Sequence, residues 1–146
     1  LNGVVQSTCE LTRALAEKAN VELSLELPEK SVHIDADAAQ IQQVLTNLIT
    51  NAIAAMPNGG TVTVSLCDEP DDDRVTLRVT DTGTGIDSSA LPHVFEPFYT
   101  TKDVGEGTGL GLSIAYGIVR EHGGDIQIES ELNQGTTFKV TFPIQS

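Results

Sequence analysis

The chain has 146 residues, of which 39% are hydrophobic and 20% charged, as in an ordinary globular domain. Its formal net charge of -13 argues against sequence-independent binding to nucleic acid, which relies on lysine and arginine side chains. No stretch approaches the roughly 18 apolar residues that span a bilayer, and residues 1–10 lack the pattern of a signal peptide. Cys9 and Cys67 stand apart, without zinc-ligand spacing, which indicates free thiols in a reducing compartment. We therefore expect a cytoplasmic domain that makes no direct membrane contact.

The first half of the chain predicts two helices and two strands. Residues 4–18 carry apolar side chains at helical spacing and predict the first helix. Residues 21–27 alternate between apolar and polar side chains and predict a half-buried strand, which residues 32–34 follow as a short second strand. Asp37 is expected to cap the clearest helix, whose apolar stripe ends at the sequence MPNGG at 56–60.

The second half predicts mainly strands. Residues 62–66 and 75–79 alternate around an acidic turn and predict a strand pair. Residues 82–108 show little periodicity and are typical of a long functional loop. A helix over 110–121 and two closing strands within 126–142 follow. Together these elements predict an α+β fold, a two-layer sandwich with about three helices over one face of a mixed, mainly antiparallel sheet.

Two asparagines of the second predicted helix suggest a ligand. Asn47 and Asn51 are four residues apart, so they project from the same side of the helix, beside its apolar stripe. Asparagine is an indifferent helix former, and its amide oxygen suits a Mg²⁺ ion that also carries triphosphate oxygens and water. The alternative is that both are solvated surface amides.

A carboxylate followed by glycines leaves the predicted sheet at residues 81–85, with the sequence DTGTG. Asp81 directly follows a strand, and Gly83 and Gly85 allow a ligand to approach the backbone closely. The exocyclic amino group of adenine is a donor that matches this carboxylate, whereas guanine presents an acceptor oxygen there. An ordinary turn after a strand is the alternative.

Alternating glycines at 105–111 lead straight into the third predicted helix, which favours a phosphate-binding loop at a helix N-terminus. The loop lacks the Gly-Lys-Ser/Thr of a Walker loop and the preceding strand of a dinucleotide fingerprint; a flexible linker is the alternative. The aromatic segment 95–102 could close as a lid, with Lys102 near a phosphate. The alternatives are core filling by Phe95 and Phe98 and a solvated lysine.

In this order, these segments resemble the GHKL superfamily of ATP-binding domains, and specifically the histidine kinases. QVLTNLITNAIAAM (43–56) resembles the N box, DTGTGI (81–86) the G1 box, FEPFYTTK (95–102) the F box, GTGLGLS (107–113) the G2 box and GTTF (135–138) the last glycine box. The sequences PFYTTK and AMPNGG are most similar to those of the nitrogen-regulation and oxygen-sensing branch of the histidine kinases. The resemblance implies one catalytic domain over 1–146, whose opening helix (1–18) follows the dimerisation helices of a full kinase.

The resemblance also implies a role for each candidate residue. Asp81 would bind the adenine amino group, helped through water by Thr136 and by the turn at Gly83 and Gly85. Asn51 would hold Mg²⁺, and Asn47 would support the triphosphate and is a second candidate for the metal. Residues 96–108 would form the ATP lid. The further nucleotide contacts are expected at Ile86, Thr101, Lys102, Gly107, Thr108, Gly109, Leu110 and Gly111, and the catalytic set is Asn47, Asn51 and Lys102.

The function implied is that of a protein histidine kinase in two-component signal transduction. Such a domain binds ATP and Mg²⁺ and transfers the γ-phosphoryl group to a histidine on the kinase's dimerisation domain, upstream of a response regulator. Since His33, His93 and His122 all lack a phosphoacceptor context, we expect them to be structural and the acceptor to lie outside this chain. The isolated domain is then expected to be a monomer.

One departure from the family concerns the N box. Ala54 and Ala55 stand where many relatives carry a lysine or arginine and then an aromatic residue, which leaves more of the phosphate contact to Lys102. The ATP-hydrolysing clamps of the same fold place a glutamate base where Asn47 stands, and an amide cannot act as a base. The remaining rivals are a serine kinase and a module that signals through nucleotide binding alone.

Overall fold

The apolar periodicity of the chain becomes helices and strands in a computed structural model, which describes residues 2–28, 36–56, 58–69, 74–83, 111–131 and 134–143. Within these ranges the helices are α1 (Asn2–Lys18), α2 (Ala38–Ala54) and α3 (Gly111–Glu121). The strands are β1 (Val21–Glu26), β2 (Gly60–Glu69), β3 (Arg74–Asp81), β4 (Asp125–Glu131) and β5 (Gly135–Pro143). The strand predicted at 32–34 and most of the loop predicted at 82–108 lie outside the described residues.

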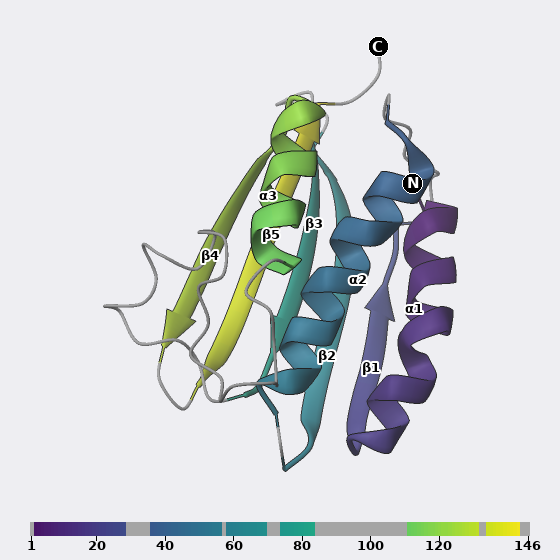
Figure 1. Cartoon of the computed structure of the whole chain (residues 1–146), viewed down its shortest axis with the longest axis vertical. Coiled ribbons are helices and arrows are strands. Elements are labelled where there is room, and N and C mark those ends of the chain that lie inside the picture. The colour runs from purple at the N-terminus through teal and green to yellow at the C-terminus, as the bar shows by residue number, and fades with distance from the viewer. Residues whose placement is uncertain are drawn as a thin grey trace.

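The five described strands form one sheet in the order β1-β2-β3-β5-β4. Only β1 and β2 pair in parallel, and the other three pairings are antiparallel. The helices lie side by side on one face of this sheet, with α2 between α1 and α3 (Figure 1). The predicted two-layer α+β sandwich with a mixed, mainly antiparallel sheet is thereby confirmed.

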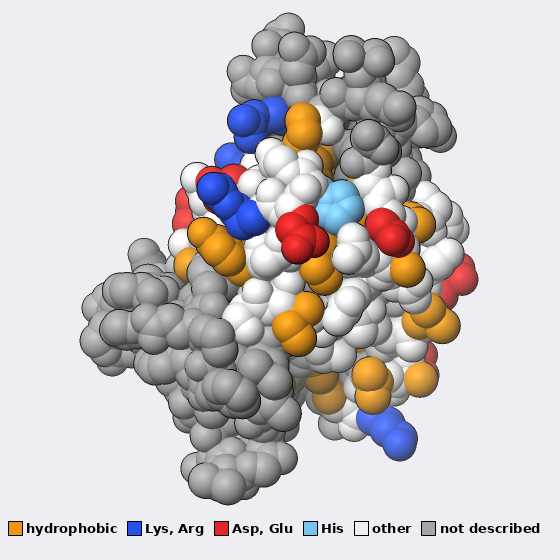
Figure 2. Space-filling view, turned by 45° about the horizontal axis from the view of Figure 1, so that its top comes forward, with side chains coloured by type: hydrophobic (Ala, Val, Ile, Leu, Met, Phe, Trp, Pro, Cys, Tyr) orange, Lys and Arg blue, Asp and Glu red, His pale blue; other side chains and the backbone are white. Residues whose placement is uncertain are grey.

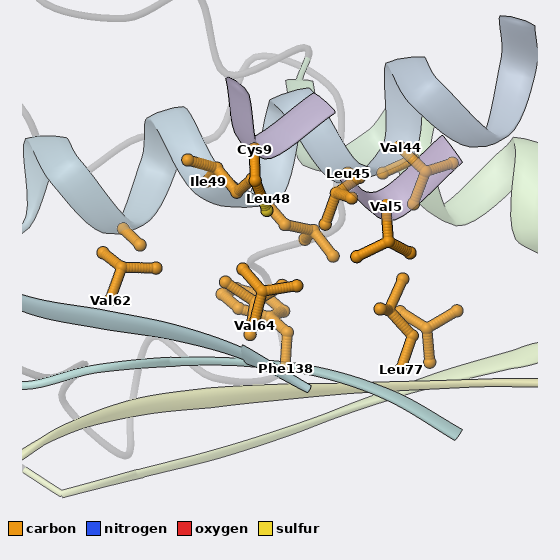
Figure 3. Close-up of a cluster of buried hydrophobic side chains, with 14 of the residues drawn as sticks. Val5, Cys9, Val44, Leu45, Leu48, Ile49, Val62, Val64, Leu77 and Phe138 are labelled. Atoms are coloured by element: carbon orange, nitrogen blue, oxygen red, sulfur yellow. The ribbon is translucent and has the colours of Figure 1, made fainter. Parts of the chain in front are cut away.

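The core lies between the two layers because each strand alternates its side chains between the faces of the sheet. Figure 3 shows strand residues such as Val64, Leu77 and Phe138 meeting Leu45 and Leu48 of α2. Full burial of one such side chain contributes about 1.5–3 kcal/mol, more than the propensity differences among ordinary helix residues. Packing therefore fixes α2 in place, and its buried stripe consists of Ile41, Val44, Leu45, Leu48, Ile49 and Ala52.

A histidine joins α2 and α3 at the end where α2 begins. The side chain of Asp37 caps α2 by accepting hydrogen bonds from the backbone N–H groups of Ala39 and Gln40. The backbone N–H of Asp37 in turn donates to Nε2 of His122, 3.2 Å away, while Nδ1 of His122 lies 2.7 Å from the carbonyl oxygen of Ile118. In this arrangement Nε2 accepts a hydrogen bond, and Nδ1 carries the proton that it donates to Ile118. Figure 2, which brings this end forward, shows a histidine at the surface with acidic side chains on either side.

The opposite end of the molecule gathers the segments that carry the predicted site. The C-terminus of α2, the end of β3 and the start of β5 lie toward the lower end in Figure 1, and the first turn of α3 is the end of that helix nearer to them. Strand register agrees, because Asp81 at the end of β3 pairs with Thr136 near the start of β5. None of the helices within the described ranges has the length and apolar character needed to cross a bilayer.

Candidate functional site

A row of three polar side chains lies across β3, β5 and β4 at this end of the sheet. Asp81 of β3 pairs with Thr136 of β5, and Thr136 pairs with Ser130 of β4, so the three side chains stand on the same face, toward the helices. The next row inward is wholly apolar and consists of Val64, Val79, Phe138 and Ile128. On β3, β5 and β4 the change from apolar to polar therefore occurs within one step along the strand, whereas β2 places the buried Val62 opposite Asp81.

Asp81 is a carboxylate held away from water, with only 3% of its surface exposed. Its Oδ1 accepts a hydrogen bond from the backbone N–H of Gly83 at 2.9 Å. Burial raises the pKa of Asp81 above its ordinary range, and backbone N–H groups of Gly83 and Thr136 oppose that rise by donating to the carboxylate. A carboxylate has room for about four hydrogen bonds, so this one can accept further donors from a ligand.

Two glycines let three chain segments meet around Asp81. At Gly83, a Cβ atom would lie 2.5 Å from the carbonyl oxygen of Ala55, at the end of α2. Gly135 has a φ of +112°, which side-chain-bearing residues rarely adopt, and a Cβ there would collide with the carbonyl oxygen of Asp81. Larger residues at either place would push α2 or β5 away from the carboxylate.

Thr82 fastens the turn after Asp81 to its surroundings. Its hydroxyl oxygen accepts a hydrogen bond from the backbone N–H of Thr61 at 3.1 Å, and the same hydroxyl lies 3.6 Å from the sulfur of buried Met56. One side chain thus joins the end of β3 to β2 and to the segment that follows α2. The turn therefore has contacts of its own with β2 and with the segment that follows α2.

Asn47 and Asn51 lie on α2, which packs against both β3 and α3. Both side chains are half-buried, at the margin of the buried stripe, as their four-residue spacing requires. Within the described ranges, no group of three or more His, Cys, Asp or Glu side chains could hold a metal alone. Two amide oxygens suit a Mg²⁺ ion whose other ligands are phosphate oxygens and water, so the residues present fit that metal.

The candidate residues fall into four groups. Asp81, Gly83 and Thr136 are brought together, and Asn47 and Asn51 lie on the helix whose C-terminal end touches Gly83. Gly111 is the first residue of α3. The remaining candidates lie outside the described residues, and their roles stay predictions: Gly85, Ile86, Thr101, Lys102, Gly107, Thr108, Gly109 and Leu110.

Sequence reasoning missed Ser130 and Thr82. Ser130 could have been found from strand register, because a short turn between β4 and β5 places it opposite Thr136. Thr82 offered no such signal, since its contacts with Thr61 and Met56 join segments more than twenty residues apart in the sequence.

Comparison with known proteins agrees with this geometry. Residues 36–146 match the family model described as "Histidine kinase-, DNA gyrase B-, and HSP90-like ATPase". The chain is 43% identical over 137 residues to the sensor kinase CckA of Brucella abortus, an alignment that covers 85% of this chain and 14% of that protein. The chain therefore spans only a small part of the length of this curated relative.

Solved structures show the same fold. The nucleotide-free catalytic domain of the histidine kinase ThkA superposes with a TM-score of 0.86 at 34% identity, covering 99% of this chain and 92% of that one. ThkA has also been solved in complex with the response regulator protein TrrA; that match has a TM-score of 0.82 at 30% identity and covers 99% of this chain and 40% of the other.

Proposed function

The chain belongs to the histidine kinase-, DNA gyrase B- and HSP90-like ATPase family, and from this membership we propose that it is the ATP-binding catalytic domain of a sensor histidine kinase. In this proposal the domain binds ATP with Mg²⁺ and passes the γ-phosphoryl group to a histidine on another part of the kinase. The observation that carries the proposal is the buried carboxylate of Asp81, placed beside Thr136 where the core ends.

The adenine base would bind at the polar row. Its amino group is a donor that matches the carboxylate of Asp81, while Thr136 and the turn at Gly83 and Gly85 complete the contact. Guanine would place a carbonyl oxygen against the carboxylate and leave a buried charge without a partner, which is unfavourable by several-fold or more in affinity. We therefore propose a site that is selective for ATP over GTP.

The triphosphate would lie between α2 and the start of α3. Asn51 would hold Mg²⁺ and Asn47 would support the triphosphate, with Lys102 and the glycines before Gly111 contributing from the lid. Bound Mg²⁺ would supply charge neutralisation on the transferring phosphoryl group. The chain's own residues would orient the nucleotide, and the amide of Asn47 cannot activate a water molecule, so transfer is favoured over hydrolysis.

The partner would be the dimerisation domain that carries the acceptor histidine, with a response regulator downstream. Support comes from α3, which begins at the predicted phosphate loop and leaves Ile114 and Tyr116 exposed by 40% and 39%. Gly117, which follows Tyr116, is exposed and has no atom within 4 Å of the position of a Cβ, so a partner could approach the helix backbone closely there. A histidine aimed at the γ-phosphate must come to this end of the domain. We place the reaction in the cytoplasm, whether or not the full-length protein is anchored in a membrane.

The first experiment is calorimetric titration of the domain with ATP and GTP, with and without Mg²⁺. We expect binding of ATP but not of GTP, strengthened by Mg²⁺. Binding of neither nucleotide would contradict the proposal, and equal binding of both would contradict the role of Asp81.

An Asp81→Asn variant, which keeps the size of the side chain, should bind ATP about tenfold or more weakly, because a hydrogen bond to a charged group contributes about 1.5–3 kcal/mol.

A transfer assay then separates a kinase from a module that only binds nucleotide. Radiolabelled ATP and the domain are mixed with a separately supplied dimerisation domain from a related kinase, and label on histidine is measured. An Ile114→Asp variant should lose transfer while its ATP affinity stays unchanged. Leu11→Asp is the matched control, since Leu11 is 66% exposed on α1, away from the site. Equal loss in both variants would contradict docking on α3.

A further inference from the structure

Two of the hydrogen bonds of Ser130 lie within or beside the polar row. Its hydroxyl oxygen lies 3.0 Å from the carbonyl oxygen of Gly135 and 2.8 Å from the hydroxyl oxygen of Thr136. A carbonyl oxygen can only accept, so Ser130 donates its single proton to Gly135. In the second bond Ser130 must then be the acceptor, and the hydroxyl of Thr136 must be the donor.

This assignment of the two hydroxyl protons decides whether the hydroxyl of Thr136 is a donor or an acceptor on the side of Asp81. Its one hydroxyl proton points to Ser130, so toward Asp81 its oxygen presents lone pairs only. Thr136 is 4% exposed and stands directly opposite Asp81 on the neighbouring strand, where side chains of paired residues lie about 5 Å apart. The site thus offers two hydrogen-bond acceptors side by side, one charged and one neutral.

We propose that Ser130 is a specificity-determining positioning residue: by taking the proton of Thr136, it keeps that hydroxyl an acceptor and so strengthens the preference for a base with an amino group at position 6. The inference rests on the proposed function, because it assigns to Asp81 and Thr136 the recognition of adenine. Without Ser130, the hydroxyl of Thr136 could rotate and donate to a carbonyl oxygen, directly or through a water molecule. A base with an oxygen at position 6 would then be rejected less strongly.

A purely structural role would have a different signature. Ser130 also joins β4 to the start of β5 through Gly135, so its loss is expected to lower the melting temperature of the domain. A structural defect of that kind would weaken binding of every nucleotide by a similar factor. Only the positioning role predicts a change in the ratio of two affinities.

The test compares ATP with inosine triphosphate, which carries a carbonyl oxygen in place of the 6-amino group. Dissociation constants for both are measured by calorimetry in the parent and in Ser130→Ala. We expect the preference for ATP to fall about three- to tenfold in the variant, the range that one neutral hydrogen bond contributes. Ser130→Thr keeps a hydroxyl at this position and should keep the parent's preference.

A double variant makes the assignment specific. In a Thr136→Val background there is no hydroxyl proton to position, so Ser130→Ala should leave the ratio of the two affinities unchanged. The proposal is overturned if Ser130→Ala alone leaves the ratio at the parent's value, or if it shifts the ratio equally in both backgrounds. Should Ser130→Ala fail to fold, Ser130→Cys, whose thiol is a weak acceptor, should show a smaller fall in the same direction, and no fall would overturn the proposal.

The experiment distinguishes failure of the proposed ATP binding from failure of the proposed role of Ser130. A parent domain that binds neither nucleotide refutes ATP binding itself. A parent that prefers ATP, with a Ser130→Ala variant that prefers it equally, refutes only the role of Ser130.

Discussion

At the scale of single residues, Asp81 shows how a binding site opposes stability. The fold buries its carboxylate beside an apolar row, and burial penalises the charged form. Two backbone N–H groups reduce the penalty without removing it, because the pKa remains raised. In the proposed function, a donor on the ligand would satisfy the remaining capacity to accept hydrogen bonds, so the carboxylate that weakens the free domain would also select its ligand.

A pH dependence follows from that raised pKa. Between the ordinary value of 3.8 and the higher folded value, the folded state binds more protons than the unfolded state, so rising pH lowers stability through this group. We expect the free energy of unfolding of the parent, relative to Asp81→Asn, to decrease as pH rises from below 3.8 toward neutrality. Urea denaturation of both proteins across this range measures the difference. A difference that stays constant or grows with pH would show that the carboxylate is not penalised by burial.

Asn51 separates metal binding from nucleotide binding. If its amide holds Mg²⁺, Asn51→Ala should reduce Mg²⁺-dependent phosphoryl transfer by about tenfold or more while nucleotide affinity without Mg²⁺ changes by less than about threefold. Asn58→Ala is a suitable control, because Asn58 is an exposed asparagine just beyond α2. Transfer by Asn51→Ala at the parent's rate would refute the metal role.

The residue-level picture was only partly accessible from the sequence. Asp81 and Thr136 stand at the ends of alternating strands, where the pattern itself marks a departure from the core. Ser130 belongs to no recognisable motif, and its place opposite Thr136 follows only from the register of β4 against β5. The direction of a hydroxyl proton depends on the two oxygen atoms around it, which no spacing rule contains.

At the scale of elements, the hydrogen bond between Asp37 and His122 joins the start of α2 to the end of α3 and adds to the packing of the two helices. His122→Ala removes the acceptor for the N–H of Asp37 and the donor to Ile118, and should lower the free energy of unfolding by about 1–3 kcal/mol. His122→Gln and His122→Asn are useful comparison variants, since an amide side chain can keep one of the two hydrogen bonds, to Asp37 or to Ile118. Chemical denaturation should rank both between the parent and His122→Ala. A parent-like stability of His122→Ala would show that the bridge contributes nothing.

Elements were the part of the fold that periodicity predicted best. The apolar stripe of α2 and the alternation in β2, β3 and β5 follow directly from burial on one side of each element. The pairing of β1 in parallel with β2 could not be read from these patterns, because alternation is the same in both directions. The bridge at His122 was equally hidden, since its partner Asp37 lies 85 residues away.

At the scale of the whole molecule, ligand binding should stabilise the fold, because the site uses residues from β3, β4 and β5 that exist together only in the folded state. At a concentration of ATP about 100 times its dissociation constant, linkage contributes about 2.7 kcal/mol. For a domain of this size, that corresponds to a rise in melting temperature of about 5–10 °C. Differential scanning calorimetry with Mg²⁺ measures it, with GTP as the control. No rise with ATP would contradict a site assembled from the folded sheet.

The polar row also has a consequence for the protein during its synthesis. Asp81 is translated long before Thr136, and the carboxylate has no neighbouring strand on that side until β5 pairs with β3. Such long-range pairing is slow to form, because a large loop must close first. A nascent chain that has not yet released β5 from the ribosome therefore exposes the DTG turn without a formed pocket. If the site binds a nucleotide as we propose, such an incomplete chain would lack Thr136 and with it one side of the pocket.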